Sequence, residues 1–246
     1  MDEQGPRRGR GHRAGRLPYN PRVPTGLSLE ARELRKSFDG GLVVALAGAS
    51  LRVAAGERVA LTGPTGCGKT TLLALLALLA TPDSGEILID GAPASSIRSP
   101  ESWRAREVGI VFQLHHLLPH LTVLENAMLK AAAGRAVDRR GRDQLAAMLE
   151  RLGLAHRAHA RANVLSGGER QLAALARALI GEPRLVLADE PTGSVDSTTG
   201  RRILEELDRW SRETGGTLLL ATHDPAVAAW ASREVKMLDG RIIDDA

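Results

Sequence analysis

The chain has few aromatic residues, one cysteine and no long apolar run. Phe, Trp and Tyr make up 2% of the 246 residues, so a core has to be built mainly from Leu, Val, Ile and Ala. The single cysteine, Cys67, excludes an intrachain disulfide and is compatible with a reducing compartment. The longest apolar run, residues 72–80, spans nine residues, whereas a membrane-spanning helix needs about 20. The sequence therefore predicts no membrane crossing, and its polar first residues predict no signal peptide.

Positive charge is concentrated at the start of the chain. The formal net charge is +4, and residues 1–26 contain six arginines against two acidic residues. This segment is rich in Gly and Pro and lacks periodic apolar residues, so it is predicted to be a disordered tail. Its role is either that of a solvated extension, which we favour, or contact with anionic lipid head groups. Because the rest of the chain is close to neutral, no nucleic-acid partner is expected.

Strand and helix patterns alternate from residue 27 to residue 246. Residues 29–38 and 42–46 flank an Asp-Gly-Gly turn, which indicates an antiparallel hairpin. Further strands are predicted at 57–62, 86–90, 185–188 and 217–221, and a last hairpin at 235–243. Helices are expected between them, including residues 68–80 and a helix that opens with the capping-box pair Ser166 and Glu169. The alternation indicates an α/β fold with a mainly parallel sheet.

Residues 63–70 read GPTGCGKT and match the phosphate-loop pattern G-x-x-x-x-G-K-[ST] in full. They lie between a predicted strand and a predicted helix, so backbone N–H groups and the helix N-terminus can surround phosphates. Lys69 is expected to contact the β- and γ-phosphates, and the Thr70 hydroxyl is expected to ligate Mg²⁺. Alone, the pattern leaves kinases, GTPases and helicases open. The expected ATP contacts are Gly63, Pro64, Thr65, Gly66, Cys67, Gly68, Lys69, Thr70 and Thr71.

Residues 165–171 read LSGGERQ, and this heptad resembles the signature motif of ABC ATPases in full. Ser166, Gly167 and Gly168 leave backbone N–H groups exposed at a helix start, which is an anion-binding arrangement. In the family this site holds the γ-phosphate of ATP bound to the other subunit. The resemblance therefore implies a head-to-tail homodimer bridged by ATP.

Residues 185–191 read LVLADEP and resemble the Walker B strand of the same family. Two carboxylates follow a buried strand at the edge where open α/β sheets bind ligands. Asp189 is expected to hold Mg²⁺, and Glu190 is expected to act as the general base toward water.

Four further residues stand where the family has functional positions. Gln113 is similar to the glutamine that contacts Mg²⁺ and water, and His223 to the histidine that contacts the γ-phosphate. Asp196 resembles the aspartate that crosses the dimer interface. Phe38 resembles the aromatic residue that stacks on adenine, and it offers an aromatic face for that contact. The motifs occur in the family's order, and the resemblance covers about residues 27–246.

The resemblance implies an ATPase domain at 27–246 with a P-loop NTPase (RecA-like) core, an N-terminal antiparallel β subdomain and an inserted α-helical subdomain at about 114–180. It implies ATP and Mg²⁺ as cofactors and a separate transmembrane permease as partner. The chain would then lie in the cytoplasm, peripheral on the cytoplasmic face of the inner or plasma membrane, with membrane contact through the permease.

Two stretches are similar to one branch of the family, which serves lipoprotein release, macrolide-type efflux and cell division. These are Gly193 after the Walker B strand and residues 112–126, FQLHHLLPHLTVLEN. The second stretch is expected to receive the membrane partner, and its histidines lack the cysteine or carboxylate that would complete a metal site. Ser194 and Val195 depart from the usual Asn-Leu, and Thr70 replaces the commoner Ser.

Three other functions compete with transport of a lipoprotein or an amphipathic, drug-like molecule. The first is a soluble or cell-division-type ABC ATPase that uses ATP-driven dimerisation for regulation. The second is a translation or DNA-repair ATPase, but such proteins have two cassettes or long insertions, and this chain has one cassette and neither insertion. The third is an inactive nucleotide binder, against which Lys69, Glu190 and His223 argue.

Overall fold

The computed structural model describes residues 26–134 and 139–245. Its strands are β1 (Leu29–Phe38), β2 (Val43–Val53), β3 (Arg58–Thr62), β4 (Ser84–Ile89), β5 (Ala92–Pro93), β6 (Val108–Val111), β7 (Leu185–Asp189), β8 (Thr217–Thr222), β9 (Arg233–Leu238) and β10 (Arg241–Asp245). Its α-helices are α1 (Lys69–Leu76), α2 (Pro100–Glu107), α3 (Val123–Gly134), α4 (Arg139–Arg151), α5 (Gly167–Leu179), α6 (Ser197–Thr214) and α7 (Pro225–Ala228).

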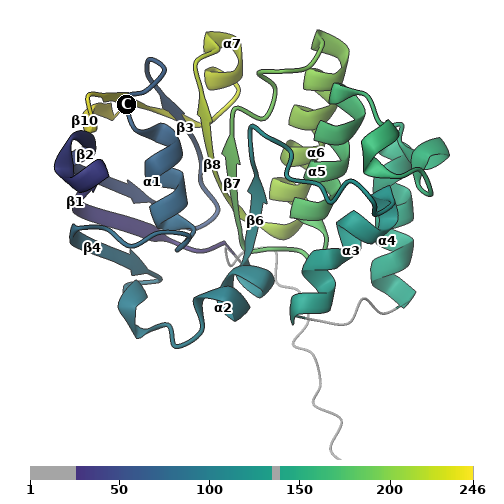
Figure 1. Cartoon of the computed structure of the whole chain (residues 1–246), viewed down its shortest axis with the longest axis horizontal. Helices are drawn as coiled ribbons and strands as arrows, with labels where there is room; N and C mark the ends of the chain where they lie inside the picture. Colours follow the sequence, from purple (N-terminus) through teal and green to yellow (C-terminus); the bar gives the residue numbers. More distant parts are fainter. Residues whose placement is uncertain (1–25, 135–138, 246) are drawn as a thin grey trace, which may run out of the picture.

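The strands form two sheets (Figure 1). The larger sheet has the order β10-β9-β3-β8-β7-β6, and all its neighbours are parallel except β9 and β10. The smaller sheet, β2-β1-β4-β5, is antiparallel throughout. The predicted α/β fold with a mainly parallel sheet and an antiparallel N-terminal part is thus confirmed.

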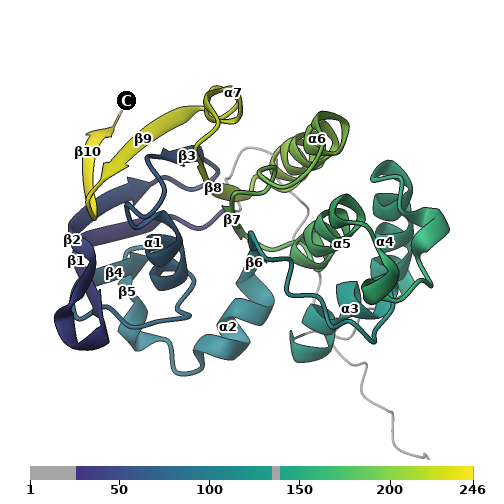
Figure 2. The same cartoon turned by 45° about the horizontal axis from the view of Figure 1, so that its top comes forward.

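The larger sheet has a hydrophobic core on each face. Because side chains alternate along a strand, Leu218 and Leu220 of β8 enter one core, while Leu219 and Ala221 enter the other. The first core contains buried residues of α3, α4, α5 and α6, and the second contains those of α1 and the smaller sheet. Figures 1 and 2 show α1 enclosed by strands, whereas α3 to α6 stand together on the other side of β7.

Most sequence predictions of elements are confirmed, but their ends differ. The first hairpin, the capping box at Ser166 and the last hairpin are present. The predicted helix at 68–80 was too long, because α1 ends at Leu76 and Leu78 has a left-handed φ of 54°. Strand β2 runs seven residues beyond the predicted 42–46, since it pairs with β1 over its whole length.

The tail predicted at residues 1–26 lies outside the described residues except for Gly26, which is buried. Within residues 26–134 and 139–245, no helix is both long enough and apolar enough to span a bilayer.

Candidate active site

The phosphate loop joins β3 to α1 and is packed against two other segments. A Cβ atom on Gly63 would lie 2.1 Å from the Met237 carbonyl oxygen, and one on Gly68 would lie 2.4 Å from that of Ala45. Both glycines have a positive φ, of 149° and 109°, so only glycine fits at either position. Gly240 also donates its N–H to the carbonyl oxygen within the loop at Cys67, at 2.9 Å. Strand β2 and the C-terminal hairpin therefore fix the shape of the loop.

Lys69 begins α1 and is folded back on the loop. Its side chain is buried, and Nζ donates to the carbonyl oxygens of Gly63 at 2.7 Å and Pro64 at 3.1 Å. These partners are neutral backbone groups, so phosphate oxygens would form stronger, charge-assisted bonds with the ammonium. Cys67 is also buried and its Sγ lies 3.9 Å from Nζ, which leaves little room for a reagent at the thiol.

The sheet edge beside the loop has oxygen groups that suit a divalent cation. Thr70 Oγ1 donates to Asp189 Oδ2 at 2.7 Å, while the buried Oδ1 of Asp189 has no hydrogen-bond partner. Burial raises the pKa of Asp189, with Glu190 acting in the same direction and Thr70 and Lys69 opposing it. An unpartnered buried carboxylate oxygen beside a hydroxyl fits a Mg²⁺ ion, which prefers oxygen ligands.

Glu190 and His223 are brought together by two neighbouring parallel strands. β7 and β8 end side by side, and Glu190 Oε1 lies 2.8 Å from His223 Nδ1. The Glu190 side chain is 11% exposed and its residue has a left-handed φ of 45°, with its N–H donating to the carbonyl of Ala221. Strained backbone of this kind is common at functional sites. The predicted general base and the predicted phosphate-contacting histidine are therefore partners.

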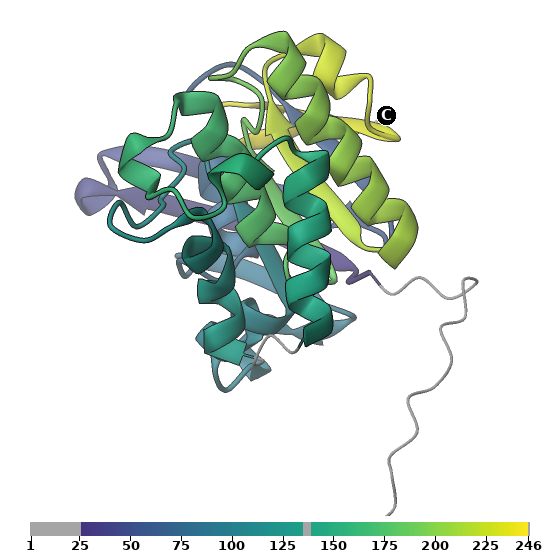
Figure 3. The same cartoon turned by 90° about the vertical axis from the view of Figure 1, so that its right-hand side faces the viewer.

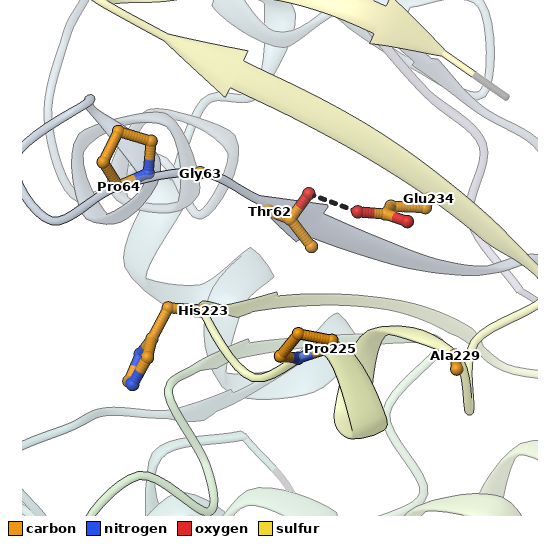
Figure 4. A pocket seen from close by; sticks show the side chains of 7 residues that line it. All are labelled: Thr62, Gly63, Pro64, His223, Pro225, Ala229 and Glu234. Carbon is orange, nitrogen blue, oxygen red and sulfur yellow. Dashed lines mark hydrogen bonds between the residues drawn. The ribbon is translucent and has the colours of Figure 1, made fainter.

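A pocket of about 380 Å³ opens between the phosphate loop and His223. Figure 4 shows Gly63 and Pro64 on one side and His223 with Pro225 on the other. At its far end, Thr62 donates to Glu234 at 2.7 Å. His223 therefore lines the same pocket as the loop, although in Figure 4 its ring points away from Gly63 and Pro64.

The signature motif forms the start of α5. Ser166 Oγ accepts from the Glu169 N–H at 3.2 Å, and Glu169 Oε2 accepts from the Ser166 N–H at 2.7 Å. Arg157 Nε donates to the other carboxylate oxygen at 2.9 Å, and the Ser166 N–H is the main cause that lowers the pKa of Glu169. A Cβ atom on Gly167 would meet nothing within 4 Å. The start of α5 is therefore held by Glu169 and Arg157, while the space beside Gly167 is open.

Phosphate loop and signature do not meet within one chain. Helix α5 packs against α3, α4, α6 and β6, whereas α1 packs against β1, β2, β7 and β8. Figure 2 shows α5 beside α3, α4 and α6 and apart from α1, and Figure 3 shows this group of helices from the front. Gly168 instead lies near Asp196 and Thr199, since a Cβ atom there would be 3.9 Å and 3.4 Å from their side-chain oxygens.

Asp196, Phe38 and Gln113 lie at or just beyond the ends of α6, β1 and β6. Asp196 caps α6 by accepting from the N–H groups of Thr198 and Thr199, both at 3.0 Å. Phe38 ends β1 with 45% of its surface exposed, and Lys36 Nζ lies 5.8 Å from the centre of its ring. Gln113 is exposed just beyond β6, which runs beside β7.

Among the described residues no group of three His, Cys, Asp or Glu side chains could hold a metal ion. The sequence did not predict the roles of Arg157, Arg177 or the buried Gln171, whose Nε2 donates to the carbonyl of Pro191 at 2.9 Å. Gln171 is the last residue of the LSGGERQ motif at 165–171, and its place in that motif is the sequence signal that could have indicated a role.

Residues 46–193 match the family model described as ABC transporter. Lipoprotein-releasing system ATP-binding protein LolD 2 of Rhodospirillum rubrum is 47% identical, over 87% of this chain and 95% of that protein. LolD of Bordetella pertussis is 44% identical, over 90% and 97% of the two chains. The ATP-binding cassette MJ0796, solved as a dimer in a post-hydrolysis state with ADP and Pi, has a TM-score of 0.82 at 33% identity, over 89% of this chain and 97% of that chain.

Proposed function

This chain belongs to the ABC transporter family as an ATP-binding and ATP-hydrolysing subunit, and we propose that it drives the release of lipoproteins through a separate membrane permease. The names of the two relatives, which match along 95% and 97% of their length, support this cargo. They do not favour a purely regulatory ABC ATPase. The chain would then be peripheral on the cytoplasmic face of the inner or plasma membrane, without a nucleic-acid partner.

Hydrolysis is assigned to the edge formed by β7 and β8. The observation that carries it is the 2.8 Å contact between Glu190 and His223 beside the phosphate loop. Glu190 would accept a proton from the attacking water, and His223 would orient that carboxylate and contact the γ-phosphate. Lys69 would exchange its two carbonyl partners for the β- and γ-phosphates.

Thr70 and Asp189 would hold Mg²⁺, with Gln113 as an additional ligand, and the ion would neutralise charge on the phosphates. Before ATP arrives, the Thr70 hydroxyl is kept in place by its bond to Asp189. The remaining residues 63–71, apart from Pro64, which has no N–H, would surround the phosphates with N–H groups. Phe38 would stack on adenine through its exposed face.

We further propose that two chains form a head-to-tail homodimer around two ATP molecules. Ser166, Gly167 and Gly168 lie away from the phosphate loop of their own chain, and the helix start is open where Gly167 stands. A phosphate bound there would therefore come from the other subunit. Asp196, next to Gly168, would lie at the same interface.

Residues 114–180 are proposed to form the helical subdomain that receives the permease. Leu114 and Leu118 lie before α3 and are 71% and 41% exposed, so this segment offers apolar side chains that a partner could cover. Membrane contact would then be made by the permease alone.

Reconstitution with the co-purified permease in lipid vesicles tests the proposal. We expect ATP-dependent release of a fluorescent lipoprotein to an acceptor protein, and no release with a Glu190→Gln subunit. ATP hydrolysis that proceeds without release, but with efflux of an amphipathic drug, would refute the lipoprotein assignment and leave the ATPase assignment intact.

A further inference from the structure

Arg177 lies in the second half of α5, and its guanidinium group is bonded to the segment that follows Gln113. Nη1 donates to the carbonyl oxygen of His116 at 2.5 Å, and Nη2 donates to that of His115 at 2.8 Å. Residues 113–118 have no helix or strand bonds of their own. The arginine therefore supplies donors to two carbonyl groups that no helix or strand bond satisfies.

The segment held by Arg177 has a strained conformation. His116 has a left-handed φ of 47°, which is uncommon for a residue with a side chain. Its ring packs edge to face on Phe112, with 4.9 Å between ring centres. Phe112 directly precedes Gln113, so the contacts of His116 fix the chain on both sides of the glutamine.

Arginine suits this position better than any other residue type. Its planar group presents two parallel donors, which match two successive carbonyl oxygens, while lysine has one compact ammonium. Arg177 is half-buried, and this burial lowers the pKa of its guanidinium group. Charge-assisted bonds to the two carbonyls offset part of that cost.

The same helix carries the signature at its other end. Ser166 caps α5, and Arg177 follows eleven residues later, which is about 16 Å along the helix axis. We propose that Arg177 is a positioning residue for hydrolysis, which holds Gln113 in its place at the edge of β6 and ties that place to the signature helix. The inference rests on the proposed role of Gln113 at the Mg²⁺ ion and the water.

Arg177→Lys tests this inference, with Arg104→Lys as a matched control. Arg104 is also half-buried, and its Nη1 donates to the carbonyl of Leu78, another residue with left-handed φ, at the end of α1. Hydrogen exchange at the Leu118 N–H, which donates to Asn126 Oδ1 at 2.8 Å, should become about tenfold faster in Arg177→Lys and should not change in Arg104→Lys. We expect kcat for ATP to fall about tenfold in Arg177→Lys, with KM within about twofold, because the phosphate loop is unchanged.

A double-mutant cycle separates positioning from general support of the fold. If Arg177 acts through Gln113, Arg177→Lys should lower kcat by less than about twofold in a Gln113→Ala background. An equal loss in both backgrounds would overturn the inference, as would an unfolded Arg177→Lys protein, since lysine keeps the charge and the apolar stem. If Gln113→Ala leaves kcat unchanged, the proposed role of Gln113 is wrong, and the inference about Arg177 is wrong with it.

Discussion

Glu190→Gln should turn a transient dimer into a stable one with very low turnover. The glutamine side chain has the same shape and keeps a polar atom near His223, which now lies 2.8 Å from the carboxylate. It cannot accept a proton from water, and loss of a positioned general base lowers rates by about 10² to 10⁴. We therefore expect kcat to fall at least about a hundredfold while ATP still binds.

The expected stabilisation of the dimer follows from the separation, within one chain, of the phosphate loop before α1 and the signature motif at the start of α5. Each dimer then closes around two ATP molecules. ATP stabilises the dimer by the difference in its affinity for dimer and monomer, so a shared site that binds ATP about 100 times more tightly than the phosphate loop alone contributes about 2.7 kcal/mol at saturation. Two sites give about 5.4 kcal/mol, which tightens the dimer roughly ten-thousandfold.

Size-exclusion chromatography with light scattering measures this difference. The Glu190→Gln protein should be a monomer, or weakly associated, without nucleotide and a dimer with ATP and Mg²⁺. Adding Ser166→Arg should abolish the dimer, because an exposed cap position tolerates the side chain in the monomer but the cation fills the phosphate site. A protein that stays monomeric at saturating ATP would refute the shared-site mechanism.

Three further predictions concern individual side chains. Burial raises the pKa of Asp189, so the folded state binds its proton more strongly than the unfolded state, and stability is lost as pH rises from about 4 through the folded pKa. Asp189→Asn should therefore raise the melting temperature of the nucleotide-free protein more at pH 7 than at pH 4, and it should stop hydrolysis; equal shifts would contradict this. Glu206→Ala removes two hydrogen bonds that Arg151 donates, at 2.9 and 2.5 Å, and should lower the free energy of unfolding in urea by about 2 to 3 kcal/mol. The same substitution should have a smaller effect in an Arg151→Met background, where those bonds are already absent. Cys67 is 4% exposed, so maleimide should label the native protein at least about tenfold more slowly than the protein in urea, and ATP should slow labelling further; equally fast labelling would show that the loop is open.

Local bonds explain why some elements could be predicted from the sequence and others could not. Both bonds of the capping box at α5 join residues three positions apart, so the pattern alone predicts where the helix begins. The end of α1 also has local bonds, from the Leu79 N–H to Ala74 and from the Leu78 N–H to Leu75, both at 2.9 Å. However, the left-handed residue is Leu78 in place of the usual glycine, and its carbonyl accepts from Arg104 of α2, 26 positions away. Apolar residues continue through 72–80, so periodicity could not reveal that stop.

The candidate site shows the same division between short-range and long-range signals. Parallel neighbouring strands bring Glu190 and His223 together, and the sequence predicts both strands and the residues that follow them. The partners of Arg177 are 61 and 62 positions away on a segment without regular structure. No spacing rule connects them, so this link required coordinates.

Helix α5 connects the two halves of the proposed mechanism. Its first turn carries the groups proposed to bind ATP of the other subunit, and Gln171 in its next turn donates to Pro191, directly after Glu190. Its second half holds the segment after Gln113 through Arg177. A shift of this helix on phosphate binding would therefore reach the base and the glutamine of its own chain together. Coupling between two binding sites is reciprocal, so whatever effect ATP at one shared site has on the affinity of the other site must be matched by an equal effect in return.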